Sequence, residues 1–378
     1  MIKYPMVDLK GQYKKIKPEI DKAVLDVIDS AAFIKGPAVS NFQSDLEKYL
    51  NVKHVITCGN GTDALQLALM ALGLQPGDEV ITTTFTFIAT AEVIALLKLK
   101  PVLVDVLPDT FNIDPEAVEK AVTGKTKAII PVHLFGQTAD IHAILKIAQK
   151  YNLYVVEDTA QALGAEFTCP ESGKTKKAGT FGDIGCTSFF PSKNLGAFGD
   201  GGALFTDNDE LAEKIRAMAN HGMKVRYYHD YVGINSRLDT IQAAILDIKL
   251  KYLDQYAAAR QKAAQFYNNA FDGNKKLKTP ETAQFTTHVF HQYTLVLDKS
   301  INRDGLMKHL AGKGIASAVY YPVPLHLQKA YSDPRYSLND FPVAENLSGT
   351  VLSLPIHTEL TPSIQQYIVD AVNEYLNK

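Results

Sequence analysis

The sequence predicts an α/β protein in which helices cover both faces of a mainly parallel sheet. From about residue 50 to 205, short apolar runs alternate with amphipathic segments. This alternation is typical of parallel strands that are joined by helices. The length of 378 residues exceeds one ordinary hydrophobic core, so we also expect a smaller C-terminal α/β domain.

Each run is assigned by its length and its flanking residues. In the segment Asp63–Leu72, three leucines share one helical face and Gly73 can end the helix. The other helix-like segments are Thr86–Leu97, Pro115–Val122 and Ile141–Lys150. The strand-like runs are His54–Cys58, Glu79–Thr82, Val102–Val106, Lys127–Val132, Leu153–Glu157, Thr187–Phe190 and Gly202–Thr206. Ligands of such sheets bind at the carboxyl ends of strands, so polar residues that follow these runs are the first site candidates.

The pattern changes toward the C-terminus. A long helical stretch, about Asp239–Asn268, leads away from the sheet. We expect a large domain over residues 1–250 and a small domain over residues 251–378, against which the N-terminal segment can pack. The expected elements of the small domain are the strand Val289–Leu297, the helix Arg303–Lys313, the strand Ile315–Tyr320 and a helix after Pro362. The polar stretch Thr168–Ala178 predicts an exposed hairpin or loop.

Composition argues against several classes of function. A formal net charge of -2, with no basic block, provides no concentration of positive charge that would bind nucleic acid or an anionic membrane surface. The three cysteines, Cys58, Cys169 and Cys186, lack metal-ligand spacing, so we expect idle thiols and no metal site. We see neither a signal peptide nor a run long enough to span a bilayer. A cytoplasmic protein is therefore expected.

The segment Gly-Asn-Gly-Thr-Asp, residues 59–63, lies between a predicted strand and a predicted helix. Free N–H groups at a helix start bind phosphate, Gly61 allows close approach and Thr62 adds a hydroxyl. A turn followed by an ordinary helix cap explains the same residues. The pattern is neither a dinucleotide fingerprint nor a Walker loop, which disfavours nicotinamide or ATP as cofactor.

Lys193 is the most informative single residue. It lies in a glycine-rich stretch near Phe189, Phe190 and Phe198, which would desolvate an amine and lower its pKa. Asp158 closes the run Val-Val-Glu-Asp. A lysine that forms a Schiff base, with a carboxylate that keeps a pyridine nitrogen protonated, is the pair that pyridoxal phosphate (PLP) chemistry requires. Taken singly, a solvated lysine and a helix-capping aspartate remain the alternatives.

Further residues near these two are candidates for binding. Gln161 can donate to the phenolic oxygen of the cofactor, and Ser188 and Ser192 can donate to phosphate or substrate. Phe85 and Phe87 are candidates for a ring stacked on the cofactor, with a plain core position for Phe85 equally open.

A second polar segment, residues 233–239, precedes the long helix. Arg237 in this segment is either a clamp for a carboxylate or phosphate, or a solvated charge at a helix start. The sequence leaves both interpretations open.

Taken together, these motifs resemble the DegT/DnrJ/StrS family. The matching runs are Gly-Asn-Gly-Thr-Asp-Ala-Leu at 59–65, Glu-Asp-Thr-Ala-Gln at 157–161, Ser-Phe-Phe-Pro-Ser-Lys-Asn-Leu-Gly at 188–196 and Gly-Ile-Asn-Ser-Arg-Leu-Asp-Thr-Ile-Gln-Ala-Ala at 233–244. The resemblance covers essentially the whole chain. It implies the type I PLP-dependent aminotransferase fold and a homodimer with shared active sites.

The resemblance also implies a reaction, amino transfer from L-glutamate to a keto nucleotide sugar for surface polysaccharides such as lipopolysaccharide. The likeness is greatest to members that aminate 3-oxo sugars, particularly UDP-2-acetamido-2-deoxy-3-oxo-glucuronate. A dehydratase branch of the family replaces the Schiff-base lysine by histidine, so Lys193 favours amino transfer. Sugar dehydration or another type I PLP reaction, and a non-catalytic sensor with this fold, are the alternatives.

Roles for individual residues follow from the same resemblance. It implies that Lys193 binds the cofactor covalently, that Asp158 holds the pyridine nitrogen and that Gln161 contacts the ring hydroxyl. It places Phe85 in the stacking position. The implied phosphate ligands are Gly61, Thr62, Ser188 and, from the neighbouring subunit, Asn235. The implied sugar-nucleotide residues are Phe33, Ser192, Arg237, Tyr320 and Tyr321.

The chain departs from close relatives at two of these positions. Relatives often have tyrosine in place of Phe33, and His-Tyr-Pro in place of Tyr320-Tyr321-Pro322. Both departures concern the sugar that is bound and not the reaction.

Overall fold

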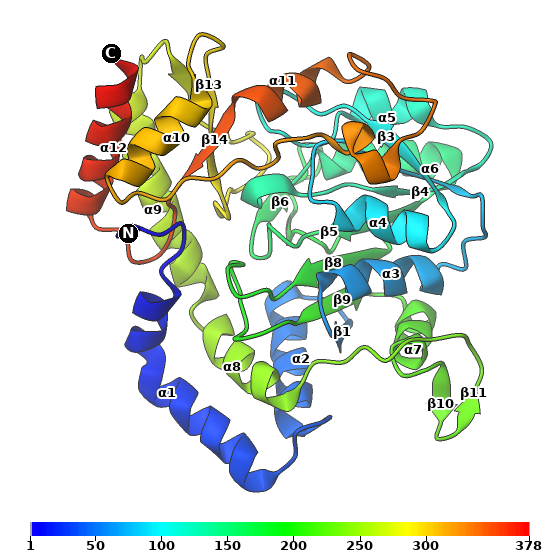
Figure 1. Ribbon diagram of the computed structural model, residues 1–378. Coiled ribbons are helices and arrows are strands. Elements are labelled where there is room, and N and C mark those ends of the chain that lie inside the picture. The colour runs from blue at the N-terminus through cyan, green and yellow to red at the C-terminus, as the bar shows by residue number, and fades with distance from the viewer. Residues whose placement is uncertain (1, 378) are drawn as a thin grey trace.

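The computed structural model describes residues 2–377, and its centre is a seven-stranded sheet with helices on both sides (Figure 1). The strand order is β1-β9-β8-β5-β4-β2-β3. The strands are β1 (His54–Cys58), β2 (Glu79–Thr83), β3 (Lys100–Val104), β4 (Thr126–Ile130), β5 (Tyr154–Asp158), β8 (Ile184–Ser188) and β9 (Gly202–Thr206). The five strands from β8 to β3 are parallel, and β9 is antiparallel to β1 and β8. The predicted mainly parallel α/β sheet is confirmed.

Two apolar layers attach the helices to this sheet. The helices are α2 (Pro37–Leu50), α3 (Gly61–Ala71), α4 (Ala89–Leu96), α5 (Pro115–Ala121), α6 (Ile141–Tyr151), α7 (Asp209–Met218) and α8 (Thr240–Leu250). Val80 and Val156 pack with α3, α4 and α7, whereas Ile81 and Val155 pack with α5 and α6. Successive strand residues face opposite sides, so strands covered on both faces read as continuous apolar runs.

A smaller core lies in the C-terminal part. An antiparallel sheet of β12 (Leu277–Lys278), β13 (Tyr293–Leu297) and β14 (Val351–Leu354) packs with α9 (Leu253–Phe271), α10 (Arg303–Gly312) and α12 (Pro362–Leu376). The N-terminal segment lies here too, since Tyr4 pairs with Ile315 and the Met6 carbonyl accepts from the Ile356 N–H. The predicted domain boundary after residue 250 falls between α8 and α9 and stays a prediction.

The remaining elements connect these two cores or project from them. They are α1 (Leu9–Ser30), which packs on α8, α11 (Pro342–Thr350), and the hairpins β6–β7 (Glu166–Thr168, Thr175–Lys177) and β10–β11 (Met223–Val225, Tyr228–His229). The β6–β7 hairpin corresponds to the predicted exposed segment. None of the helices within residues 2–377 combines the length and the apolar character needed to cross a bilayer.

The structure corrects two predicted elements. The expected helix Asp239–Asn268 is two helices, α8 and α9, because α8 packs on the core of the large sheet and α9 on the C-terminal core. The expected strand Ile315–Tyr320 is not formed. Ile315 bridges Tyr4 while Ala318 bridges Ser353, so this segment passes between two partners without following either as a strand.

Candidate active site

The N-terminus of α3 and the end of β8 meet at the carboxyl edge of the sheet. Asn60 caps α3, and its Oδ1 accepts from the Asp63 N–H at 2.8 Å. A Cβ on Gly61 would lie 2.7 Å from the Ser188 Cβ, so only glycine permits this approach. The N–H groups of Gly61 and Thr62 lie in the first helical turn and have no helical acceptor. This edge therefore presents a positive helix terminus to an anion.

Asp158 lies at the same edge, at the end of β5, and is 6% exposed. Its carboxylate accepts from the Thr90 hydroxyl at 2.9 Å and from the Ala160 N–H at 3.1 Å. Both donors are neutral, and no described residue forms an ion pair with it. A buried carboxylate of this kind is costly without a cationic partner. A protonated pyridine nitrogen would be such a partner, so this position fits the cofactor that the sequence predicts.

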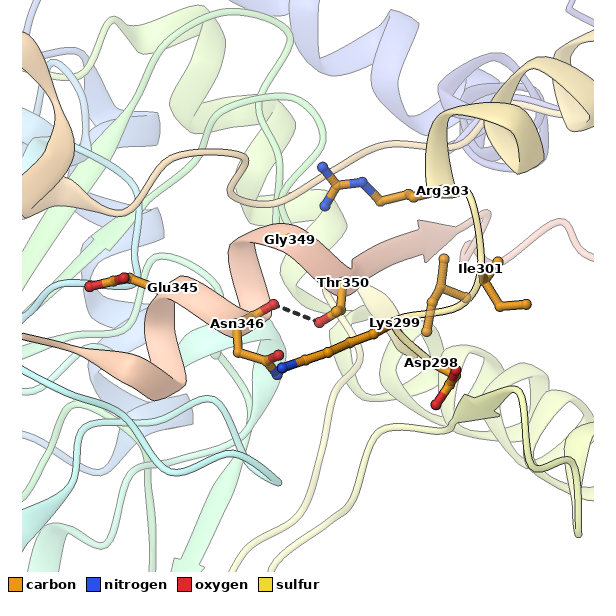
Figure 2. Close-up of a pocket in the computed structure, with 9 residues that line it drawn as sticks. Asp298, Lys299, Ile301, Arg303, Glu345, Asn346, Gly349 and Thr350 are labelled. Carbon is orange, nitrogen blue, oxygen red and sulfur yellow. Dashed lines mark hydrogen bonds between the residues drawn. The ribbon is translucent and has the colours of Figure 1, made fainter. Parts of the chain in front are cut away.

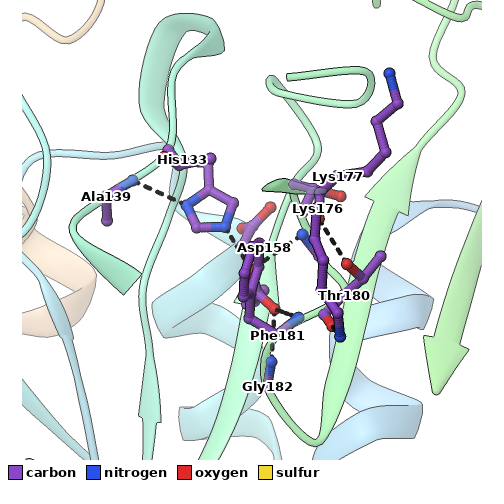
Figure 3. Close-up of polar contacts among 12 residues, drawn as sticks. His133, Ala139, Asp158, Lys176, Lys177, Thr180, Phe181 and Gly182 are labelled. Carbon is purple, nitrogen blue, oxygen red and sulfur yellow. Dashed lines mark hydrogen bonds and ion pairs between the residues drawn. The ribbon is translucent and has the colours of Figure 1, made fainter. Parts of the chain in front are cut away.

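The preceding residue, Glu157, fixes this strand end through a buried network of hydrogen bonds, whose partners His133, Phe181 and Gly182 are labelled in Figure 3. It accepts from His133 Nε2 at 2.9 Å, and His133 Nδ1 in turn accepts from the Ala139 N–H at 3.1 Å. Three loop N–H groups also donate to it at 2.7–3.0 Å, those of Gly179, Phe181 and Gly182. Burial acts to raise the pKa of Glu157, but His133 and the N–H donors reverse this effect and hold the pKa below its usual value. Glu157 is therefore an ionised anchor beside Asp158.

Replacing Glu157 by glutamine is expected to lower the free energy of unfolding by about 2–4 kcal/mol, because an amide cannot accept from all four donors. Urea denaturation measures the change. The depressed pKa means that the carboxylate stabilises the fold above its unfolded pKa, near 4.5, and less as pH falls through the folded pKa. The difference between wild type and variant should thus shrink in acid. Glu119→Gln, at an exposed ion pair with Lys150, is the control; an equal loss there would contradict the account.

Lys193 lies in the loop between β8 and β9. The loop is closed by hydrogen bonds from the Lys193 N–H to the Phe190 carbonyl and from the Ala197 N–H to the Phe189 carbonyl, both 2.8 Å. Burial lowers the pKa of Lys193 to about 8, while the charge of Asp158 acts to raise it. At pH 7 a pKa of about 8 leaves on the order of a tenth of the amine neutral. A neutral amine is the form that a nucleophile or proton carrier needs.

Gln161 connects the sheet edge to the loop that carries Tyr320 and Tyr321. Its Oε1 accepts from the Phe135 N–H at 2.8 Å, and its Nε2 donates to the Tyr321 hydroxyl at 2.9 Å. Burial raises the pKa of Tyr321, which keeps the phenol protonated. Farther along, the Leu325 N–H donates to the carbonyl of Thr84, the residue after β2, at 2.8 Å. The second Nε2 hydrogen of Gln161 can still reach a ligand.

The two candidate stacking rings have different surroundings. Phe85 is fully buried, edge-on to Phe135 and Tyr321 with ring centroids 6.4 and 6.1 Å apart. It offers no free ring face, so the stacking role expected for Phe85 does not fit its position. Phe87 is 55% exposed and lies three residues before Thr90, which bonds Asp158. The sequence contained both phenylalanines but no signal that separated the buried ring from the exposed one.

The turn that holds Asn235 and Arg237 is fastened to the start of α3. The Ser236 hydroxyl donates to Asp63 at 2.6 Å and accepts from the Gly59 N–H at 2.8 Å. Asn235 is exposed and accepts from Arg237, whose Nε is buried without a partner among the described residues. Sequence reasoning missed Ser236 and Thr90, because a hydroxyl shows no sign in the sequence of a distant carboxylate partner.

Two other predicted substrate residues border this region. Phe33 is 45% exposed, and its carbonyl accepts from the Thr240 N–H at the start of α8. Ser192 is partly exposed beside Lys193. A cavity of about 250 Å³ lies elsewhere, between the end of β13, α10 and α11 (Figure 2), and its lining contains none of the predicted site residues. The candidate site is therefore the open edge of the sheet.

Comparison with known proteins agrees with this geometry. Residues 14–373 match the DegT/DnrJ/EryC1/StrS aminotransferase family. The chain is 46% identical to UDP-2-acetamido-2-deoxy-3-oxo-D-glucuronate aminotransferase of Pseudomonas aeruginosa, over 95% of this chain and 97% of that protein. It is 48% identical to a protein named pleiotropic regulatory protein of Geobacillus stearothermophilus, over 98% of both. The structure of S. venezuelae DesV, in complex with a ketimine intermediate, superposes with a TM-score of 0.95 at 38% identity and covers 100% of both chains.

Proposed function

Because the chain belongs to the DegT/DnrJ/EryC1/StrS aminotransferase family, a family of nucleotide-sugar aminotransferases, we propose that it transfers an amino group from L-glutamate to a keto nucleotide sugar. The observation that carries this proposal is a partly buried amine, Lys193, that interacts electrostatically with a buried carboxylate, Asp158, which forms no ion pair with any described residue. The pair lies beside a helix terminus with free N–H groups. These are the contacts that a phosphorylated pyridine aldehyde needs.

Different residues at this edge would bind different parts of the cofactor. Gly61, Thr62 and Ser188 would hold the phosphate, Asp158 the pyridine nitrogen and Gln161 the ring hydroxyl. We assign the stacking position to Phe87, whose ring is exposed, in place of Phe85. Bound here, PLP supplies an electron-withdrawing ring that accepts negative charge from the substrate carbon.

The protein side chains then handle protons and orientation. Lys193 Nζ takes the proton from the α-carbon of glutamate and, in the second half of the reaction, returns one to the sugar carbon that is aminated. A pKa of about 8 suits both directions near neutral pH. Asp158 would hold a positive charge on the pyridine nitrogen, opposite the amine end of the site. The Tyr321 hydroxyl accepts from Gln161 Nε2 and stays protonated, so its own hydrogen can be donated to the substrate.

We propose a 3-oxo UDP sugar, or a dTDP analogue, as the acceptor. The 46% identical relative from Pseudomonas aeruginosa is named for a 3-oxo glucuronate, and that identity extends over nearly the whole of both chains. The residues proposed to line the sugar-nucleotide site are Phe33, Ser192, Arg237, Tyr320 and Tyr321.

We place the product in the synthesis of surface polysaccharides. The three cysteines are free, which supports the proposed cytoplasmic location.

The active form is proposed to be a homodimer in which Asn235 reaches the phosphate site of the partner subunit. The β10–β11 hairpin projects from the body of the molecule (Figure 1). Its Val225, Tyr227 and Tyr228, with the neighbouring Val232, are 63–88% exposed. Exposed apolar groups of this density are typical of a protein interface. Asn235 follows three residues later and is exposed too.

Mass spectrometry tests the reaction directly. Purified protein with PLP and glutamate is incubated with 3-oxo and 4-oxo UDP- and dTDP-sugars, and amino sugar and 2-oxoglutarate are measured. Equal amounts of both products support transamination. Loss of water from the sugar, without formation of 2-oxoglutarate, would indicate the dehydratase alternative. A protein that binds PLP but turns over no sugar would favour the sensor alternative. The 48% identical relative is named pleiotropic regulatory protein, which is the reason to test this alternative.

Replacing Phe87 by alanine is expected to weaken PLP binding roughly two- to tenfold, because a stacked ring contributes roughly 0.5–1.5 kcal/mol. Equilibrium dissociation of PLP from the dialysed protein, followed by absorbance, measures the change. Leu96→Ala, at a similarly exposed apolar residue (64%), is the control and should bind PLP as wild type does. Unchanged PLP affinity in Phe87→Ala would mean that a residue other than Phe87 stacks on the cofactor.

A further inference from the structure

Helix α8 lies against the loop that carries Lys193, and two of its side chains bond to that loop. Gln242 Oε1 accepts from the Phe198 N–H at 2.8 Å, and Lys249 Nζ donates to the Gly196 carbonyl. The two residues are seven apart, which places them two turns apart on one face of the helix. One contact uses a loop donor and the other a loop acceptor, so α8 fixes the loop at two successive points.

Lys249 is an unusual residue to find in this place. It is 1% exposed, and no described carboxylate forms an ion pair with it. Its Nζ lies 5.5 Å from the centroid of the Phe198 ring, again in the same loop. Burial lowers its pKa to about 8, and the charge of Arg260 acts in the same direction. A buried amine costs free energy that a methionine of similar length would not, so its bond to Gly196 needs a functional explanation.

The loop itself is tightly folded around Lys193. A Cβ on Gly196 would lie 2.2 Å from the Pro191 carbonyl oxygen, so the chain returns on itself within five residues. Hydrogen bonds from the Lys193 and Ala197 N–H groups close the loop from inside. The Gly196 carbonyl faces α8 instead, where it accepts a hydrogen bond from Lys249 Nζ. A displacement of Gly196 would therefore move the backbone of Lys193, three residues earlier.

We propose that Lys249 is a positioning residue for the reaction: its bond to the Gly196 carbonyl holds the loop so that the Lys193 amine stays beside Asp158. The proposal rests on the proposed function and adds a role for a residue outside the site. Gln242 supports the same loop at Phe198. Because α8 begins directly after the turn with Asn235 and Arg237, one helix connects that turn to the Lys193 loop.

Hydrogen exchange of the PLP-bound protein, without substrate, tests the proposal. Lys249→Met keeps the length and removes the donor. Amides of residues 189–198 should exchange about tenfold faster, as expected for the loss of one hydrogen bond, while those of β13 and α12 stay unchanged. The pH profile of the visible absorption band should also shift. Lys251→Met, at an exposed lysine two residues later, is the matched control and should behave as wild type.

Two further readouts separate positioning from general support of the core. If Lys249 positions Lys193, kcat falls about tenfold with KM for glutamate unchanged, and Lys249→Arg restores part of the loop protection. Unchanged exchange in residues 189–198, or protection lost equally over the whole sheet, would overturn the proposal. If Lys249→Met fails to fold, Gln242→Leu tests the other contact by the same exchange measurement. The exchange measurement on the loop needs no sugar. A failure of this proposal can therefore be distinguished from a failure of the proposed amino transfer.

Discussion

Replacing Lys193 by alanine is expected to abolish amino transfer, with kcat lower by on the order of 10⁴-fold. The amine both bonds the cofactor and moves the proton, and the loop between β8 and β9 offers no second lysine. The variant should bind PLP without the visible band of lysine-bound cofactor. Absorbance spectra and a single-turnover assay with glutamate measure the two effects.

The control for this variant is Lys174→Ala, at an exposed lysine of the β6–β7 hairpin. Its spectrum and turnover should match those of wild type. A Lys193→Ala protein that keeps the visible band, or that keeps more than a small fraction of wild-type kcat, would contradict the assignment.

Replacing Asp158 by asparagine is expected to lower kcat by about 10²–10³-fold, the usual loss for one preorganised electrostatic contact. Asparagine keeps an oxygen for the Thr90 hydroxyl but cannot hold a protonated pyridine nitrogen. The charge of Asp158 also acts to raise the pKa of Lys193. The Lys193 pKa in the cofactor-free variant should therefore be lower than in wild type.

Steady-state kinetics and the pH dependence of Lys193 acylation in cofactor-free protein measure these two changes. The second measurement requires neither PLP nor sugar, so it tests the proximity of the two groups alone. An unchanged Lys193 pKa in Asp158→Asn would mean that the carboxylate and the amine do not share one site. Asp254→Asn, at an exposed aspartate of α9, is the control.

The sheet was predictable from the sequence because its strands are buried on both faces. β1 and β9 have the bounds that their apolar runs predict, and the bounds of the other five strands of this sheet differ from the predicted ones by at most three residues. The segment 315–320 was misread as a strand because apolar alternation alone does not reveal whether one partner strand runs alongside. In the fold Ile315 and Ala318 meet different partners.

The candidate site was predictable where a residue follows a strand end. Gly61, Asp158 and Ser188 each lie at such an end, and parallel strands bring their carboxyl ends to one edge. Contacts between distant segments were not predictable. Ser236 bonds Asp63 across 173 residues, and Lys249 bonds Gly196 across 53, with no local signal for either. Phe85 and Phe87 differ only in burial, which depends on Phe135 and Tyr321 from elsewhere in the chain.

The central claim is that one cofactor ring joins the Lys193 amine to the Asp158 carboxylate. Reduction of the PLP-bound protein with borohydride makes the lysine attachment permanent, and peptide mass spectrometry then locates it. The account predicts a single phosphopyridoxyl group, on Lys193, in wild type. Its appearance on another lysine, or on none, would contradict the account.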